Sequence, residues 1–258
     1  MNVKNISRTV GLILLITGIF QLFPLLIAVI DHEPRNILAY IESLCLILLV
    51  GSALLLFSRG GNRMFSAQEG FAATGLSWIF MSAFGALPFF LSGQIPSYVD
   101  AFFEMVSGFT TTGASILTDV EALSRCNLFW RSFSHWLGGM GVLMFVLAIM
   151  SSNDSRTMHM MRAECAGPKV GRLVSKSSFS ARILYGIYIA LTVLEVVFLL
   201  FGGMPLYDSI IHACSSAGTG GFSIYGDSIA HYNSVYIEMV IAVFIILFGV
   251  NFNLYYYM

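Results

Sequence analysis

Charged residues are scarce in this sequence. Only 13 of its 258 residues are Lys or Arg and 14 are Asp or Glu, or 10% in all, whereas soluble proteins average about 25%. Hydrophobic residues make up 57% of the chain, and the mean hydropathy is +0.81. This composition excludes an ordinary soluble protein and indicates an integral membrane protein.

Other features are also missing. The apolar segments are continuous and do not alternate with a period of two, which favours helices over a transmembrane β-barrel. The four cysteines show no CxxC spacing, so neither a disulfide framework nor a metal site is indicated. The first apolar run, residues 10–30, is too long for a signal peptide and has no small-residue cleavage site, so we expect a retained helix.

The apolar segments predict an all-α integral membrane fold. Two of them are only about half of the ~20 residues that a spanning helix needs, and we expect them to enter the membrane and turn back as half-helices, at residues 97–106 and 206–216. Spanning helices are expected at residues 10–30, 36–57, 70–91, 127–150, 179–201 and 234–258. The short linker 31–35 makes the first two helices an antiparallel hairpin.

Each half-helix leads into a polar, glycine-rich stretch, at residues 107–115 and 215–223. A shift of 108 residues pairs Asp100 with Asp208, Ser107 with Ser215, Thr111 with Thr219, Gly113 with Gly221, Ser115 with Ser223 and Asp119 with Asp227. The chain is therefore predicted to repeat a unit of helix, half-helix, loop and helix. An even number of crossings separates the copies, so both run in the same direction through the membrane.

Basic residues predict the orientation. With the N-terminus in the cytoplasm, the inner segments hold Lys4, Arg8, Arg59, Arg63, Arg156, Arg162, Lys169, Arg172 and Lys176. Only Arg35, Arg125 and Arg131 fall on the outer side, and this bias favours a cytoplasmic N-terminus. The outer side collects acidic residues instead, which would concentrate cations at the mouths of both glycine-rich stretches.

The two stretches have the chemistry of a site for alkali cations. A half-helix ends in unpaired carbonyls that carry about half a negative charge. Gly113 and Gly221 can adopt backbone angles closed to other residues and so turn carbonyls toward one axis. Rings of such oxygens can replace an ion's hydration shell. A plain reversal between helices is the alternative, which the duplication beside an acidic mouth disfavours.

Three motifs stand out in the chain: Ser107-Gly-Phe-Thr-Thr-Thr-Gly-Ala-Ser115, His135-Trp-Leu-Gly-Gly-Met-Gly141 and Ala217-Gly-Thr-Gly-Gly-Phe-Ser223. They resemble the Trk/Ktr/HKT superfamily of potassium transporters, and its bacterial TrkH-type subunits in particular. In that superfamily four such units surround one pore, and each supplies a short filter segment. The resemblance implies potassium uptake through backbone carbonyls, with no cofactor and with potassium as the transported ligand.

Carried over by position, the resemblance implies filter residues Thr110, Thr111, Thr112, Gly113, Gly218, Thr219, Gly220 and Gly221. Potassium would lie at Thr111, Thr112, Gly113, Thr219, Gly220 and Gly221. Glycine at position 113 matches the potassium-selective pattern. Glu104 and His212 occupy equivalent places in the two half-helices and are expected to support the filter without touching the ion.

The sequence holds two units where the superfamily has four. We expect a hairpin at 1–64, a first pore unit at 65–155, and a second unit with its preceding cytoplasmic loop at 156–258. The chain would then be the N-terminal half of a subunit, inactive without the third and fourth units. The resemblance further implies a bacterial inner-membrane location, surrounding lipid, a homodimer and a cytoplasmic nucleotide-binding regulatory subunit (TrkA-like), and no nucleic acid.

Two alternatives come from other functional classes. In an intramembrane serine hydrolase, Ser107 or Ser215 would be the nucleophile and His135 or His212 the base. The duplication disfavours this enzyme, because neither histidine has its counterpart in the other copy, and we expect His135 to be a packing residue. A membrane scaffold that does not transport is the second alternative. Cation flux would distinguish transport from both.

Overall fold

The computed structural model describes residues 2–59, 67–139, 141 and 177–257. Within these ranges every regular element is helical, as the sequence predicts, and four helices are long and apolar enough to cross a membrane. They are Val3–Ile30, Pro34–Phe57, Gln68–Leu91 and Arg182–Phe201. The chain is thus a multi-pass, all-α membrane protein.

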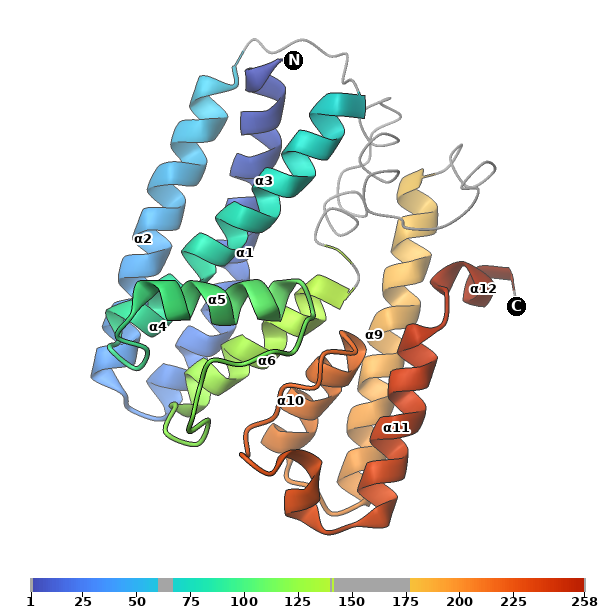
Figure 1. Cartoon of the computed structure of the whole chain (residues 1–258). Helices are drawn as coiled ribbons and strands as arrows, with labels where there is room; N and C mark the ends of the chain where they lie inside the picture. The colour runs from blue at the N-terminus through green and yellow to red at the C-terminus, as the bar shows by residue number, and fades with distance from the viewer. Residues whose placement is uncertain (1, 60–66, 140, 142–176, 258) are drawn as a thin grey trace.

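The first two helices form the expected antiparallel hairpin, α1 (Val3–Ile30) and α2 (Pro34–Phe57), which stand side by side in Figure 1. Close packing depends on glycine, since a Cβ on Gly11 would come within 3.0 Å of the Gly51 carbonyl oxygen. Small residues at such contacts let membrane helices approach each other. The hairpin covers one side of the first repeat.

The third predicted helix, 70–91, is divided into α3 (Ala67–Gly85) and α4 (Leu87–Leu91). Pro88 has no N–H with which to bond the carbonyl of Phe84. That carbonyl instead accepts hydrogen bonds from Gln21 and Ser43, each at 3.4 Å. Polar side chains of α1 and α2 thereby stabilise a break that the hydropathy pattern does not reveal.

The two short helices are confirmed as half-helices, α5 (Tyr98–Phe109) and α10 (Leu206–Ala217), with 12 residues each. Such a helix is ~18 Å long, which is too short for a hydrocarbon core ~30 Å thick. Figure 1 shows α5 running across the direction of α1 and α2. Its first turn is capped by Ser97, whose hydroxyl accepts from the Asp100 amide.

The remaining helices are α6 (Arg125–Gly139), α9 (Ser177–Phe201), η2 (Ser228–Tyr232), α11 (Val235–Gly249) and α12 (Phe252–Tyr257). The prediction of one continuous helix over 234–258 is wrong, because Val250 is extended and separates α11 from α12. A glycine ends α11, and glycine is about 1 kcal/mol less favourable in a helix than alanine. In the predicted helix 127–150, residues 140 and 142–150 lie outside the described residues.

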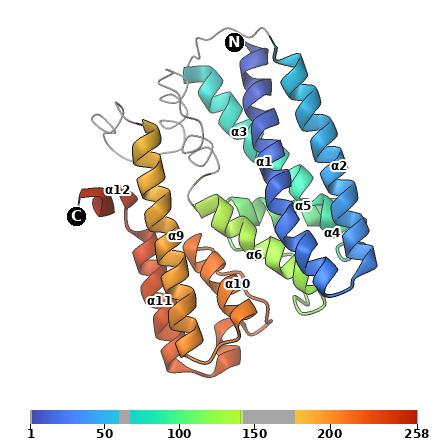
Figure 2. The same ribbon diagram turned by 180° about the vertical axis from the view of Figure 1, so that it is seen from behind.

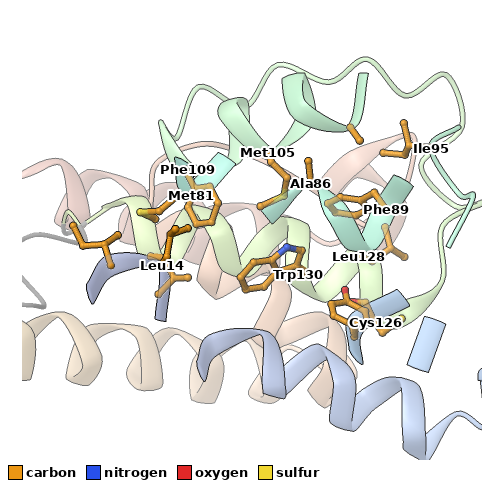
Figure 3. Packing of buried hydrophobic residues seen from close by; sticks show 14 of the residues in the cluster. Leu14, Met81, Ala86, Phe89, Ile95, Met105, Phe109, Cys126, Leu128 and Trp130 are labelled. Carbon is orange, nitrogen blue, oxygen red and sulfur yellow. The ribbon is translucent and has the colours of Figure 1, made fainter. Parts of the chain in front are cut away.

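The core of the first repeat surrounds α6. Trp130 is fully buried and lies in one cluster with Leu14 of α1 and with Met105 and Phe109 of α5 (Figure 3). Its indole N–H donates to the Gly85 carbonyl oxygen at 2.9 Å. Figure 2 shows the second repeat, in which α9, α10 and α11 lie together beside α6. Helix α6 therefore contacts the half-helices of both repeats.

Candidate ion-filter site

We call residues 110–113 filter segment 1 and residues 218–221 filter segment 2, after their predicted role. The segments have matching backbones. Thr111 and Thr219 have φ of 55° and 54°, and Gly113 and Gly221 have φ of 76° and 86°. A positive φ is uncommon outside glycine. Thr111 and Thr219 are equivalent in the two repeats, and both have a positive φ. The duplicated sequence therefore produces a duplicated backbone path.

Hydrogen bonds to the half-helices also repeat. The amide of Thr112 donates to the Ser107 carbonyl at 2.9 Å, and that of Gly220 to the Ser215 carbonyl at 3.1 Å. In segment 1 the Thr110 hydroxyl bonds the Val106 carbonyl at 2.7 Å and lies 2.8 Å from the Thr112 hydroxyl. Each segment is therefore anchored to the C-terminal end of its own half-helix, where carbonyl oxygens are in excess.

The two segments touch each other. A Cβ on Gly113 would overlap the carbonyl oxygen of Gly220, so this approach requires glycine in segment 1. The surface side of the pair is formed by the exposed residues Thr110, Thr112, Thr219 and Gly221, whereas Gly218 is buried. The predicted site residues are thus brought together, with Gly218 directed into the protein and not toward that side.

Helix α6 lies behind both segments. A Cβ on Gly138 would overlap the Phe109 carbonyl oxygen, and one on Gly218 would come within 2.6 Å of the His135 carbonyl oxygen. The ring of His135 is fully buried, and a Cβ on Gly220 would overlap it. Small residues on α6 and in segment 2 therefore let the backbones approach closely.

Glu104 and His212 hold equivalent points of the two loops. Glu104 accepts from the Ser115 hydroxyl at 2.9 Å and from the Ile116 amide at 3.0 Å. His212 Nε2 lies 3.2 Å from the hydroxyl of Ser223, the repeat partner of Ser115. Neither side chain forms part of the exposed side of the segments, since both are buried.

Arg131 also belongs to this site, although the sequence pattern had placed it only among the outer basic residues. Its Nε lies 2.5 Å from Glu104 Oε1, and its guanidinium donates to the Ser223 carbonyl at 3.0 Å. The guanidinium lies over the Phe222 ring, 3.5 Å from its centroid. An arginine within a helix that is predicted to span the membrane, here 127–150, is itself a sign of function, and this signal was available in the sequence.

The site offers little support for the hydrolase alternative. His135 Nδ1 lies 3.4 Å from the Ser215 hydroxyl, a separation that a base and nucleophile could have. His135 is fully buried and stacks on Phe222, while Ser215 is 2% exposed. A substrate carbonyl therefore has no access to Ser215, and the contact is packing beneath segment 2.

Hydrogen bonds connect residues of the predicted outer mouth. Asp208 is buried and accepts from the Tyr232 hydroxyl at 2.8 Å. Burial and this hydrogen bond raise the pKa of Tyr232, so its hydroxyl remains a donor. Glu121, in the loop of the first repeat, accepts from the amide of Gly226 in the second at 3.2 Å. The two loops are therefore joined at the mouth as well.

Among the residues that the structure describes, no three His, Cys, Asp or Glu side chains converge to hold a metal. Backbone and hydroxyl oxygens are what the segments offer, which suits hard cations of low charge.

Comparison with known proteins identifies the family. The model of the TrkH family, described as "Cation transport protein", matches residues 36–258. The chain belongs to the TrkH family. It is 34% identical over 259 residues to the Trk system potassium uptake protein TrkH of Salmonella typhimurium, covering 99% of this chain and 53% of that protein. An uncharacterized cation transporter of Methanocaldococcus jannaschii is 29% identical, over 93% of this chain and 49% of its own length.

The fold agrees with this family. The crystal structure of the potassium transporter TrkH from Vibrio parahaemolyticus superposes with a TM-score of 0.84 and 28% identity, over 99% of this chain and 52% of that one. The chain thus spans about half the length of the relatives it matches.

Proposed function

We propose that this chain supplies two of the four filter segments of a potassium-uptake pore and is inactive without the other two. The observation that carries this proposal is the contact between segments 1 and 2, whose backbones follow the same path and meet at Gly113 and Gly220. Two equivalent loops, each at the end of a half-helix, fit a ring of carbonyls around one axis.

Potassium is favoured by the chemistry of the segments and by the relatives. The exposed threonines and the glycine carbonyls supply uncharged oxygens, which can replace a hydration shell without binding the ion too tightly to release it. The Salmonella typhimurium relative is named as a potassium uptake protein. Potassium would contact Thr111, Thr112, Gly113, Thr219, Gly220 and Gly221.

The proposal extends to location and partners. We place the chain in a bacterial inner membrane with a cytoplasmic N-terminus, on the distribution of its basic residues. The remaining units, a second subunit and a nucleotide-binding regulatory subunit would complete the assembly. The cytoplasmic loop that precedes the second repeat falls largely outside the described residues, as do the proposed boundaries between 1–64, 65–155 and 156–258.

Rubidium uptake tests the proposal in cells that lack potassium uptake. A chimera in which this chain replaces the matching stretch of the Salmonella typhimurium relative should restore growth at low potassium. Gly113→Asp and Gly221→Asp should each abolish rubidium uptake. Gly203→Asp is the matched control, because Gly203 also has a positive φ of 83° but lies in the turn after α9 with no atom near its Cβ position.

Unchanged uptake in both filter variants would overturn the assignment of the filter. The chain expressed alone should give no uptake above background. Robust potassium-selective uptake by the chain alone would contradict its role as half of a pore.

A further inference from the structure

A buried ion pair connects the loops that follow the two filter segments. The side chains of Arg131 and Glu104 are 3% and 0% exposed, and their charged groups are 2.5 Å apart. Burying two charges is costly, and such a pair persists only where its remaining hydrogen-bonding groups are also satisfied. The groups that satisfy this pair are the loops that follow the two filter segments.

Glu104 forms hydrogen bonds with the loop of the first repeat. It projects from the half-helix α5 and accepts hydrogen bonds from the Ser115 hydroxyl and the Ile116 amide. These residues follow Gly113 in the chain, so the carboxylate holds the loop that leaves segment 1. A carboxylate that accepts several bonds in a buried site is strongly oriented by them.

Arg131 forms a hydrogen bond with the loop of the second repeat. Its guanidinium donates to the Ser223 carbonyl, two residues after Gly221, and covers the ring of Phe222. Phe222 is in turn sandwiched, because the His135 ring stacks on it with a centroid distance of 4.0 Å. The planar fork of arginine can bond a carboxylate and a carbonyl in fixed directions, which a lysine ammonium cannot do.

The ion pair has no counterpart in the second repeat. At the shift of 108 residues Glu104 corresponds to His212 and Arg131 to Met239, and Met239 is 59% exposed. The filter segments are duplicated, but this connection exists once, at the junction of the two repeats. Its role therefore concerns the relation between the segments and not the folding of each one.

We infer that Arg131 is a positioning residue that, through Glu104, couples the geometry of segment 1 to that of segment 2 and so sets ion selectivity. The inference rests on the proposed function only for its selectivity part. The coupling itself is a property of this chain, since both segments and both charges lie within it.

Hydrogen exchange of the purified chain tests the coupling. Glu104→Gln removes a charge in the first repeat, and the Glu104 carboxylate is linked to residues 220–225 through Arg131. We expect amide exchange in 220–225 to become at least tenfold faster. Arg125→Gln is the matched control, because Arg125 pairs with Asp31 at 3.1 Å on the partly exposed surface; exchange in 220–225 should not change.

Unchanged exchange in 220–225 upon Glu104→Gln would overturn the inference. If that variant exchanges fast throughout the chain, the double variant Glu104→Gln with Arg131→Gln is measured instead, because it leaves no unpaired charge. We then expect the amides of α1 and α2 to stay protected while those of 220–225 exchange fast. Parental exchange in 220–225 in the double variant would also overturn it.

Selectivity gives a second readout in the chimera. Arg131→Lys keeps the charge but not the fork, and we expect the ratio of rubidium to sodium uptake to fall at least tenfold while Arg125→Lys leaves it unchanged. An unaltered ratio in Arg131→Lys refutes the role in selectivity. A chimera that transports neither ion in its parental form would refute the proposed function. The exchange experiment would still test the coupling, because it does not depend on transport.

Discussion

Replacing Gly113 by alanine should damage both filter segments at once. Gly113 has a φ of 76°, and an L-residue in the left-handed region costs roughly 1–2 kcal/mol. The added Cβ would also overlap the Gly220 carbonyl oxygen. That oxygen is backbone, so it cannot rotate aside, and overpacking of this kind typically costs about 1–3 kcal/mol.

The expected loss of stability for Gly113→Ala is therefore roughly 2–5 kcal/mol, the sum of left-handed strain and overpacking. Gly203→Ala isolates the strain, because Gly203 has a φ of 83° and no atom within 4 Å of its Cβ position. It should cost about 1–2 kcal/mol. The difference between the two variants measures the contact between the segments.

Two measurements check this prediction. Thermal unfolding of the purified chain in detergent should show Gly113→Ala less stable than Gly203→Ala. In the chimera, Gly113→Ala should reduce rubidium uptake about tenfold or more, equivalent to about 1.4 kcal/mol in ion binding, while Gly203→Ala retains uptake. If the two variants unfold at the same temperature and transport equally at equal membrane abundance, the contact between Gly113 and Gly220 does not exist as described.

Two further predictions concern the outer mouth and the orientation. Tyr232→Phe removes a hydrogen bond to the buried Asp208 and should lower the free energy of unfolding by about 1.5–3 kcal/mol. The control Tyr236→Phe loses only a bond to the Phe198 carbonyl and should lower it by about 0.5–1.5 kcal/mol. Equal losses in the two variants would show that Tyr232 does not hold Asp208. Cysteine labelling tests the topology: a membrane-impermeant maleimide should modify Asp119→Cys in intact cells and Lys4→Cys only after permeabilisation, and the reverse pattern would invert the proposed orientation.

The sequence predicted which segments are spanning helices and which are half-helices, but it predicted the helix ends less well. The hairpin and the half-helices follow from the length of apolar segments, which is a local property. The division at Ala86 was not predicted, because it depends on Gln21 and Ser43 reaching the Phe84 carbonyl from two other helices. The end of α11 at Gly249 was missed because the apolar residues Val250, Phe252 and Leu254 follow the break.

The candidate site was likewise predictable in part. Segments 1 and 2 were located from glycine and threonine at a fixed shift, and the roles assigned to their residues stay predictions. Arg131 was treated as part of a charge count, although its place within the predicted spanning helix 127–150 could have singled it out. Its contact with Ser223 spans 92 residues of sequence, and no periodicity in the chain encodes that distance.

By itself, the sequence determined the membrane class, the two half-helices and the repeat, because hydropathy, segment length and a constant shift are all legible along one chain. Tertiary structure alone decided that Gly113 meets Gly220 and that one ion pair joins the two loops. Both contacts exist because α6 packs against α5 and α10 together, which brings distant backbones within reach of each other. Folding thus converts two similar stretches into one paired site.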